Sequence, residues 1–283
     1  MPDEPQRDPR DPLSIFAPDL FRGTTALVTG GGRGIGRAIA LGFARLGADV
    51  VIASRREENL APTAREIEAL GAQCLAVPMS IREIDQVDEL VRAAYGRFGS
   101  VDFLVNNAGG QFPATPKSIS DGGWRAVVDL NLNGTWNMCS RIAPRMAERG
   151  RGAIVNIVHI YSFDRGAPAF AHSGAARAGV VNLTRSLAAH YARHGVTVNA
   201  LAPGSIATRG LREEEYARAS VADYESIQVR DIPARRLGTA DEVAAATLFL
   251  CSPGGRYFTG AALVMDGGLY LGSWSPMLDP EKP

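Results

Sequence analysis

A glycine-rich turn follows the first apolar run of the chain. Residues 25–29 are apolar or β-branched, and the sequence then reads Gly30-Gly31-Gly32-Arg33-Gly34-Ile35-Gly36 before a stretch with helical spacing. Glycines between a strand and a helix let the backbone approach a pyrophosphate, which then lies at the amino end of the helix. The turn therefore predicts a dinucleotide site. Its expected contacts are Gly30, Gly32, Arg33, Gly34, Ile35 and Gly36.

Side chains able to move or hold a proton gather in two later segments. His159 and Tyr161 follow an apolar run, and Ser173 and Arg177 are four residues apart on one face of an expected helix. Imidazole titrates near neutrality, a serine hydroxyl is a much weaker acid than a phenol, and arginine stays protonated. The alternative interpretations are a solvent-exposed loop aromatic for Tyr161 and a structural strand-end residue for His159.

Three further motifs follow predicted strands. They are Asn106-Asn107-Ala108-Gly109, Pro203-Gly204-Ser205-Ile206-Ala207-Thr208 and Met265-Asp266-Gly267-Gly268. Together with the Gly-x3-Gly-x-Gly spacing of the turn, they make the chain resemble the short-chain dehydrogenase/reductase family over about residues 18 to 270. The family's adenine-binding Asp is missing, because Met79-Ser80 occupies its place. The resemblance implies cofactor contacts at Asn107, Ala108, Gly109, Arg177, Pro203, Gly204, Ile206 and Thr208.

The end of the second predicted strand indicates which dinucleotide binds. A ribose 2′-hydroxyl is bound there by a carboxylate, whereas a 2′-phosphate requires cations. The sequence has Ser54-Arg55-Arg56 and no acid at the strand end, with a further cation at Arg33. A guanidinium group can bond two phosphate oxygens. These residues predict NADPH rather than NADH; the alternative is a solvated basic turn.

The expected catalytic residues depart from the family's usual pattern. Most members use Tyr-x-x-x-Lys on one helix, an earlier Ser and an Asn. Here Ser173 and Arg177 replace the Tyr and Lys, and His159 replaces the Ser, whereas Asn131 is retained. The stretches 109–112 and 171–180 are similar to the trans-2-enoyl-CoA and 2,4-dienoyl-CoA reductases of the family. In the dienoyl reductases, the resemblance implies, the working Tyr lies in the loop where Tyr161 stands.

The resemblance implies an NADPH-dependent oxidoreductase that reduces an activated carbon–carbon double bond, most simply an enoyl thioester of coenzyme A or acyl carrier protein. Asn131 and Tyr161 would donate hydrogen bonds to the enolate oxygen, Ser173 or water would complete the set, and Arg177 would supply positive charge. One alternative is a carbonyl reductase or alcohol dehydrogenase with Tyr161 or His159 as proton donor. Another is a catalytically silent nucleotide-binding regulatory protein.

Short apolar runs alternating with helical patterns position these residues. They predict a single-domain α/β fold, a Rossmann-type doubly wound sheet of about seven parallel strands with helices on both faces. The expected organisation is a polar arm over 1–22, the dinucleotide-binding domain over 23–270 with a substrate lid at about 204–237, and a tail over 271–283. Strands are expected at 25–29, 49–53, 74–77, 101–105, 153–158, 197–200 and 262–264, and helices at 35–46, 57–70, 84–98, 129–146, 173–192 and 240–250.

Composition limits the partners. The 283 residues carry 30 acidic and 30 basic side chains, so no charge footprint for nucleic acid or an anionic membrane is present. The three cysteines are widely spaced, which argues against disulfides and a metal site and favours the cytoplasm. The resemblance implies a homotetramer built on helices 129–146 and 173–192. His172 is expected to cap a helix, and Trp124 and Trp136 to be packing residues.

Overall fold

The computed structural model describes residues 11–211 and 223–272. Within them, a seven-stranded sheet has the order β3-β2-β1-β4-β5-β6-β7, and every neighbouring pair is parallel. The order reverses between β1 and β4, which is where ligands bind in doubly wound sheets. The predicted fold class is confirmed. The strands are β1 (Thr25–Thr29), β2 (Asp49–Ser54), β3 (Cys74–Pro78), β4 (Phe103–Asn106), β5 (Gly152–Ile157), β6 (Val196–Pro203) and β7 (Ala262–Met265).

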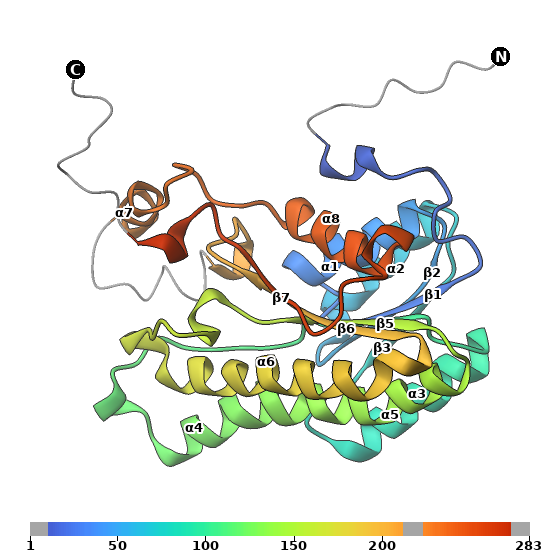
Figure 1. The fold of residues 1–283 in the computed structure, drawn as a ribbon, viewed down its shortest axis with the longest axis horizontal. Helices are drawn as coiled ribbons and strands as arrows, with labels where there is room; N and C mark the ends of the chain where they lie inside the picture. Colours follow the sequence, from blue (N-terminus) through green and yellow to red (C-terminus); the bar gives the residue numbers. More distant parts are fainter. Residues whose placement is uncertain (1–10, 212–222, 273–283) are drawn as a thin grey trace.

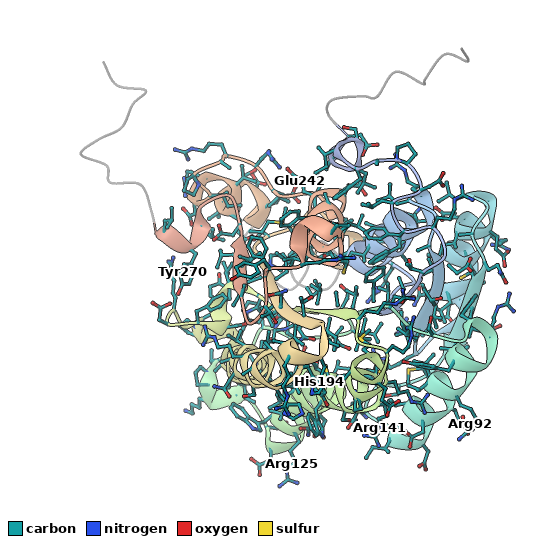
Figure 2. All side chains as sticks on the ribbon, turned by 45° about the vertical axis from the view of Figure 1, so that its right-hand side comes forward. Arg92, Arg125, Arg141, His194, Glu242 and Tyr270 are labelled. Atoms are coloured by element: carbon teal, nitrogen blue, oxygen red, sulfur yellow. The ribbon has the colours of Figure 1, made fainter. Side chains whose placement is uncertain are left out.

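Helices cover both faces of the sheet (Figure 1), with α1, α2 and α8 on one face and α3, α4, α5 and α6 on the other. Arg92, Arg125 and Arg141 project outward from the second layer (Figure 2). The helices are α1 (Gly34–Arg45), α2 (Glu57–Ala69), α3 (Ile84–Phe98), α4 (Asp121–Val128), α5 (Gly134–Glu148), α6 (Ala171–Tyr191), α7 (Tyr224–Asp231) and α8 (Ala240–Cys251).

Strand β1 shows why two hydrophobic cores form. All five of its residues are buried. Successive side chains of a strand point to opposite faces, so Ala26 and Val28 join the core beneath α1 and α8, and Leu27 joins the core beneath α3 and α5. A strand covered on both faces reads as a continuous apolar run, which is the pattern that predicted it.

The helix expected at 129–146 has different boundaries in the structure. The structure has α4, then a π-helical turn over Asp129–Asn133, then α5. Two other expectations also fail. His172 lies inside α6 and is fully buried, so it does not cap the helix. Trp124 and Trp136 remain 42% and 48% exposed, so neither is a core packing residue.

The segment before β1 contributes apolar side chains. Leu13, Phe16 and Phe21 are buried, and the Phe21 ring lies 5.1 Å from the rings of both Phe43 and Phe103. The arm expected over 1–22 is thus anchored to the core from residue 13 onward. Of the expected lid, 212–222 lies outside the described residues, as does most of the tail.

Two features are absent from residues 11–211 and 223–272. None of their helices combines the length and apolar character needed to cross a membrane. The same ranges hold no group of three or more His, Cys, Asp or Glu side chains that could bind a metal ion.

Candidate active site

The glycine turn is shaped by close backbone contact. Gly30 has a φ of +67°, and a Cβ atom added to Gly36 would lie 2.2 Å from the carbonyl oxygen of Gly30. No larger residue fits at Gly36 without moving the turn. Arg33 precedes α1 without a side-chain cap, and Gly34 and Ile35 begin the helix. The amino end of α1 can therefore offer its N–H groups to a phosphate, as the sequence predicts.

Asn107 braces this turn from the end of β4. Its Nδ2 donates to the carbonyl oxygens of Thr29 at 3.0 Å and Gly30 at 3.3 Å. The backbone N–H groups of Asn107 and Ala108 both donate to the Thr29 hydroxyl. These bonds join the ends of β1 and β4, so Asn107 positions the glycine turn.

Eight of the predicted cofactor residues line one cleft. Its volume is about 410 Å³, and Gln111 and Leu130 also line it. This cavity is lined by the glycine turn and by Arg55 and Arg56, and a nicotinamide dinucleotide fits between the ends of β1 and β2. The predicted members of the lining are Gly30, Gly32, Arg33, Ser54, Arg55, Arg56, Ala108 and Gly109.

The segment after β6 passes beside the start of α1. A Cβ atom added to Gly34 would lie 3.6 Å from Cγ2 of Thr208, so Thr208 stands beside the start of α1. Pro203 ends β6, and Gly204 packs against Asp266. Ile206 instead lines a separate cavity of about 570 Å³ that includes Tyr270. Of the four predicted residues, Thr208 thus lies beside the start of α1, whereas Ile206 lines the separate cavity.

Arg177 places a permanent positive charge beside Gly109, a residue that lines the cleft. Its Nη1 donates to the carbonyl oxygen of Ile157 at 2.6 Å. A Cβ atom added to Gly109 would lie 2.3 Å from Nη2, so only glycine leaves room for the guanidinium group. The Arg177 charge also helps to lower the pKa of His159.

Asn131 lies in the π-helical turn, with 2% of its surface exposed. Its Nδ2 donates to the carbonyl oxygens of Gly110 and Val127, both at 2.8 Å, and its Oδ1 accepts from Gly110 N at 3.3 Å. Both amide hydrogens are therefore bonded to backbone. This arrangement makes Asn131 a brace for the loop after β4, in place of the expected donor to a substrate oxygen.

His159, Ser173 and Gln111 form a chain of hydrogen bonds. His159 Nε2 lies 3.1 Å from Ser173 Oγ, and that hydroxyl donates to Gln111 Oε1 at 2.8 Å. The backbone N–H of Tyr161 donates to His159 Nδ1 at 3.1 Å. Because Nδ1 is an acceptor there, the neutral ring carries its hydrogen on Nε2 and donates it to Ser173.

The imidazole of His159 is neutral at ordinary pH. Burial, and after it the charge of Arg177, lowers its pKa from 6.5 to about 3. Removal from water disfavours the charged form of a histidine, and a neighbouring cation disfavours it further. His159 therefore cannot act as an imidazolium acid near neutrality.

Tyr161 lies on the short turn Ile160–Ser162 that follows β5. Its half-buried ring packs edge-on against His159, with the ring centroids 5.5 Å apart. The structure therefore brings Tyr161, His159 and Ser173 together, as the sequence predicts.

Two residues near the site were missed or misjudged from the sequence. The sequence indicates no role for Gln111 beyond its place in a loop that resembles the enoyl reductases. His172 is buried with its ring edge-on to Phe112 at 4.5 Å, and burial lowers its pKa. Only the fold shows that the loop after β4 meets the start of α6, where Gln111 contacts Ser173 and Phe112 contacts His172.

The chain is similar to known proteins over most of its length. A family model described as enoyl-(acyl carrier protein) reductase matches residues 30–270. The chain belongs to the short-chain dehydrogenase/reductase family. It is accordingly an enzyme, an oxidoreductase whose family uses nicotinamide dinucleotides.

Individual relatives of this short-chain dehydrogenase/reductase cover nearly the whole chain. The (3E)-enoyl-CoA-producing peroxisomal 2,4-dienoyl-CoA reductase of Pongo abelii is 38% identical over 91% of this chain and 87% of its own. The 3-oxoacyl-(acyl-carrier-protein) reductase FabG of Staphylococcus epidermidis is 35% identical over 87% of this chain and 99% of its own. Among solved structures, the citronellol catabolism dehydrogenase of Pseudomonas aeruginosa PAO1 has a TM-score of 0.79 at 39% identity, covering 90% of this chain and 98% of its own.

Proposed function

We propose that the protein is an NADPH-dependent reductase of an activated carbon–carbon double bond, with an enoyl thioester of coenzyme A or acyl carrier protein as substrate. The observation that carries this proposal is the hydrogen-bond chain at the family's usual acid position. His159 is neutral and directs its N–H to Ser173, and Ser173 directs its own hydrogen to Gln111.

This chain suits an enolate better than an alkoxide. Reduction of a ketone leaves a strongly basic alkoxide that needs an acid at once. Reduction of an enoyl thioester spreads negative charge onto the thioester oxygen, which needs hydrogen bonds and nearby positive charge. Arg177 supplies fixed charge, and the Tyr161 hydroxyl is the proposed donor to that oxygen. The lowered pKa of His159 argues against the alternative in which this residue is the proton donor of a carbonyl reductase.

NADPH is the proposed cofactor, and when bound it supplies the hydride. Arg55 and Arg56 would hold the 2′-phosphate at the end of β2, and the amino end of α1 would hold the pyrophosphate. Replacing both arginines by alanine is expected to raise KM for NADPH at least about tenfold and leave KM for NADH nearly unchanged, because only NADPH carries the 2′-phosphate. Steady-state kinetics with both cofactors test this. Arg92→Ala, an exposed change on α3, is the matched control and should alter neither value.

A homotetramer is proposed from the family resemblance. The half-exposed Trp124 and Trp136 on α4 and α5, and the exposed Phe249 and Phe258 beside the edge strand β7, offer apolar surface for subunit contacts. Light scattering after size exclusion should give about 120 kDa, four times the chain's 30.1 kDa. A cytoplasmic location is proposed from the cysteine content.

The deciding experiment follows NADPH consumption with a trans-2-enoyl-CoA, a 2,4-dienoyl-CoA and a 3-oxoacyl-CoA in parallel. Turnover of either unsaturated thioester in preference to the ketone is the expected result. The dienoyl-CoA reductase relative favours this outcome, and the 3-oxoacyl reductase relative is the reason for the ketone arm. Preferential turnover of the 3-oxoacyl-CoA would instead establish a carbonyl reductase. Cofactor binding with no turnover of any of the three would favour the silent nucleotide-binding protein.

A further inference from the structure

We propose that Gln111 is a positioning residue of this active site. Through Ser173 and His159, it fixes the turn that carries Tyr161. The effect on rate rests on the proposed function, whereas the hydrogen-bond chain itself can be tested without any substrate.

The direction of the chain follows from one backbone donor. A peptide N–H can only donate, so the bond from Tyr161 N to His159 Nδ1 places the ring hydrogen on Nε2. Ser173 Oγ accepts that hydrogen and must direct its own elsewhere. Gln111 Oε1, 2.8 Å away, is the acceptor. The opposite amide orientation would confront the serine with a second donor, so the orientation of Gln111 is set as well.

Burial makes the acceptor at Gln111 important. Ser173 is fully buried at the start of α6. A buried hydroxyl that loses its acceptor is destabilised or must rotate to a new partner. Rotation of Ser173 would change what His159 Nε2 contacts. A change at Gln111, in the loop after β4, is thereby felt in the turn after β5.

The last link is the turn itself. His159 caps it, since Tyr161 N donates to the His159 ring and His159 N donates to Ser162 Oγ at 3.3 Å. The Tyr161 ring also packs against the imidazole. The position of the phenol therefore depends on the orientation of His159. In most of the family, the positions of His159 and Ser173 hold residues that act on the substrate. In this chain, these two residues serve to align Tyr161, which lies at a different position.

The chain is tested first by nitrogen NMR of protein labelled with 15N-histidine. The sequence has four histidines, and a His159→Ser variant identifies the signals of His159. Wild type should show the neutral Nε2–H form from pH 5.5 to 8. Gln111→Met removes the acceptor at similar size and should shift these signals. Gln111→Glu keeps an acceptor and adds negative charge, so it should keep the tautomer and raise the pKa of His159. Unchanged His159 signals in Gln111→Met, or a wild-type Nδ1–H form, would overturn the proposal.

Kinetics then test positioning. Gln111→Met and Ser173→Ala should each lower kcat for the enoyl thioester about 10- to 100-fold with KM for NADPH nearly constant. The double variant should be no slower than Ser173→Ala alone, because the two residues act through one chain. Gln111→Glu should recover most of the loss. Gln73→Met, at an exposed position before β3, is the matched control and should behave as wild type.

Two outcomes separate this proposal from the proposed function. Multiplicative losses in the double variant, or no recovery with Gln111→Glu, would contradict the role of Gln111. Absence of enoyl reduction by the wild type, with the NMR response of His159 as expected, would contradict the proposed function and support the chain.

Discussion

The Tyr161 hydroxyl is the group on which the proposed reduction most depends. Tyr161→Phe keeps the ring packed against His159 but removes the hydrogen-bond donor. We expect kcat to fall about 10²- to 10³-fold, the usual effect of losing one donor to a developing oxyanion, with NADPH affinity unchanged. Stopped-flow kinetics and NADPH titration measure the two effects.

The matched control for Tyr161→Phe is Tyr257→Phe, because Tyr257 is fully exposed. Retention of the wild-type rate by Tyr161→Phe would exclude the phenol as the donor. The same loss in Tyr257→Phe would point to a general effect of the substitution.

Gly109 provides the space that Arg177 occupies. In Gly109→Ala, the new methyl group would lie 2.3 Å from Arg177 Nη2 and 2.7 Å from Asn131 Oδ1, so both side chains must move. We expect kcat/KM to fall at least about tenfold, measured at saturating cofactor. Gly110→Ala is the control, because its methyl group would meet only Leu130 Cδ2, at 3.2 Å. Equal effects of the two alanines would refute a specific role for the space at Gly109.

Single residues also show what the sequence could and could not reveal. The glycine turn and Arg55 were predictable, because local spacing after a strand determines what they face. The hydrogen-bond acceptor of Ser173 was not predictable, because Gln111 lies 62 residues away in the sequence and approaches Ser173 only in the folded chain. For Asn131, the sequence indicated the residue but not that both amide hydrogens are bonded to Gly110 and Val127.

At the scale of elements, the start of α8 is held by a capping box. Thr239 Oγ1 accepts from Glu242 N at 3.1 Å, and Glu242 Oε2 accepts from Thr239 N at 2.8 Å (Glu242 is labelled in Figure 2). Arg236 bonds both oxygens of the same carboxylate, which lowers the pKa of Glu242 to about 2. The Glu242 carboxylate thereby connects Arg236, in the expected lid segment, to the start of α8.

Removing this cap should weaken the protein. Thr239→Ala is expected to lower the free energy of unfolding by about 1 kcal/mol, because an N–H at the start of α8 loses its acceptor. Urea titration measures the change. Thr239→Ser keeps the hydroxyl and should lie close to wild type. Equal destabilisation by Thr239→Ser and Thr239→Ala would show that the threonine methyl group, and not the hydroxyl that caps α8, contributes the stability.

Element boundaries were predictable where periodicity was uninterrupted, as in α3 and β1. The predicted boundaries were wrong where tertiary contacts determine the residue at which an element ends. Strand β6 was expected at 197–200, but it continues to Pro203 because it pairs with β7 as far as Met265. A proline usually argues against a strand, and here it occupies the last position. The π-helical turn was missed because nothing in local spacing distinguishes it from an α-helix.

At the scale of the whole molecule, buried histidine makes stability depend on pH. The pKa of His159 is about 3 in the folded protein and near 6.5 when unfolded. Between these values the unfolded chain binds the extra proton, so this contribution to stability is complete above pH 6.5 and is lost as pH falls toward 3. His172, whose pKa is also lowered, acts in the same direction.

We therefore expect the free energy of unfolding to fall on acidification below pH 6.5, by up to about 1.4 kcal/mol per pH unit from His159. Urea titrations at pH 7, 6 and 5 measure this slope. His159→Ser should reduce it, whereas His194→Gln, a change at an exposed histidine, should not. A slope identical in His159→Ser and wild type would show that this imidazole does not drive the acid sensitivity.

The π-helical turn between α4 and α5 has a consequence for how the chain tolerates changes in length. A π-helical turn closes its hydrogen bond over one residue more than an α-helical turn, so it takes up an extra residue within a single turn. Deleting one residue from Asp129–Asn133 would let the segment close as an ordinary α-helical turn, and α4 would keep nearly the same rotation relative to the buried face of α5 that holds Met138 and Ile142. The wide turn that brings Asn131 to Gly110 would be lost. The hydrophobic core would therefore tolerate a one-residue deletion at a place where the loop after β4 would not.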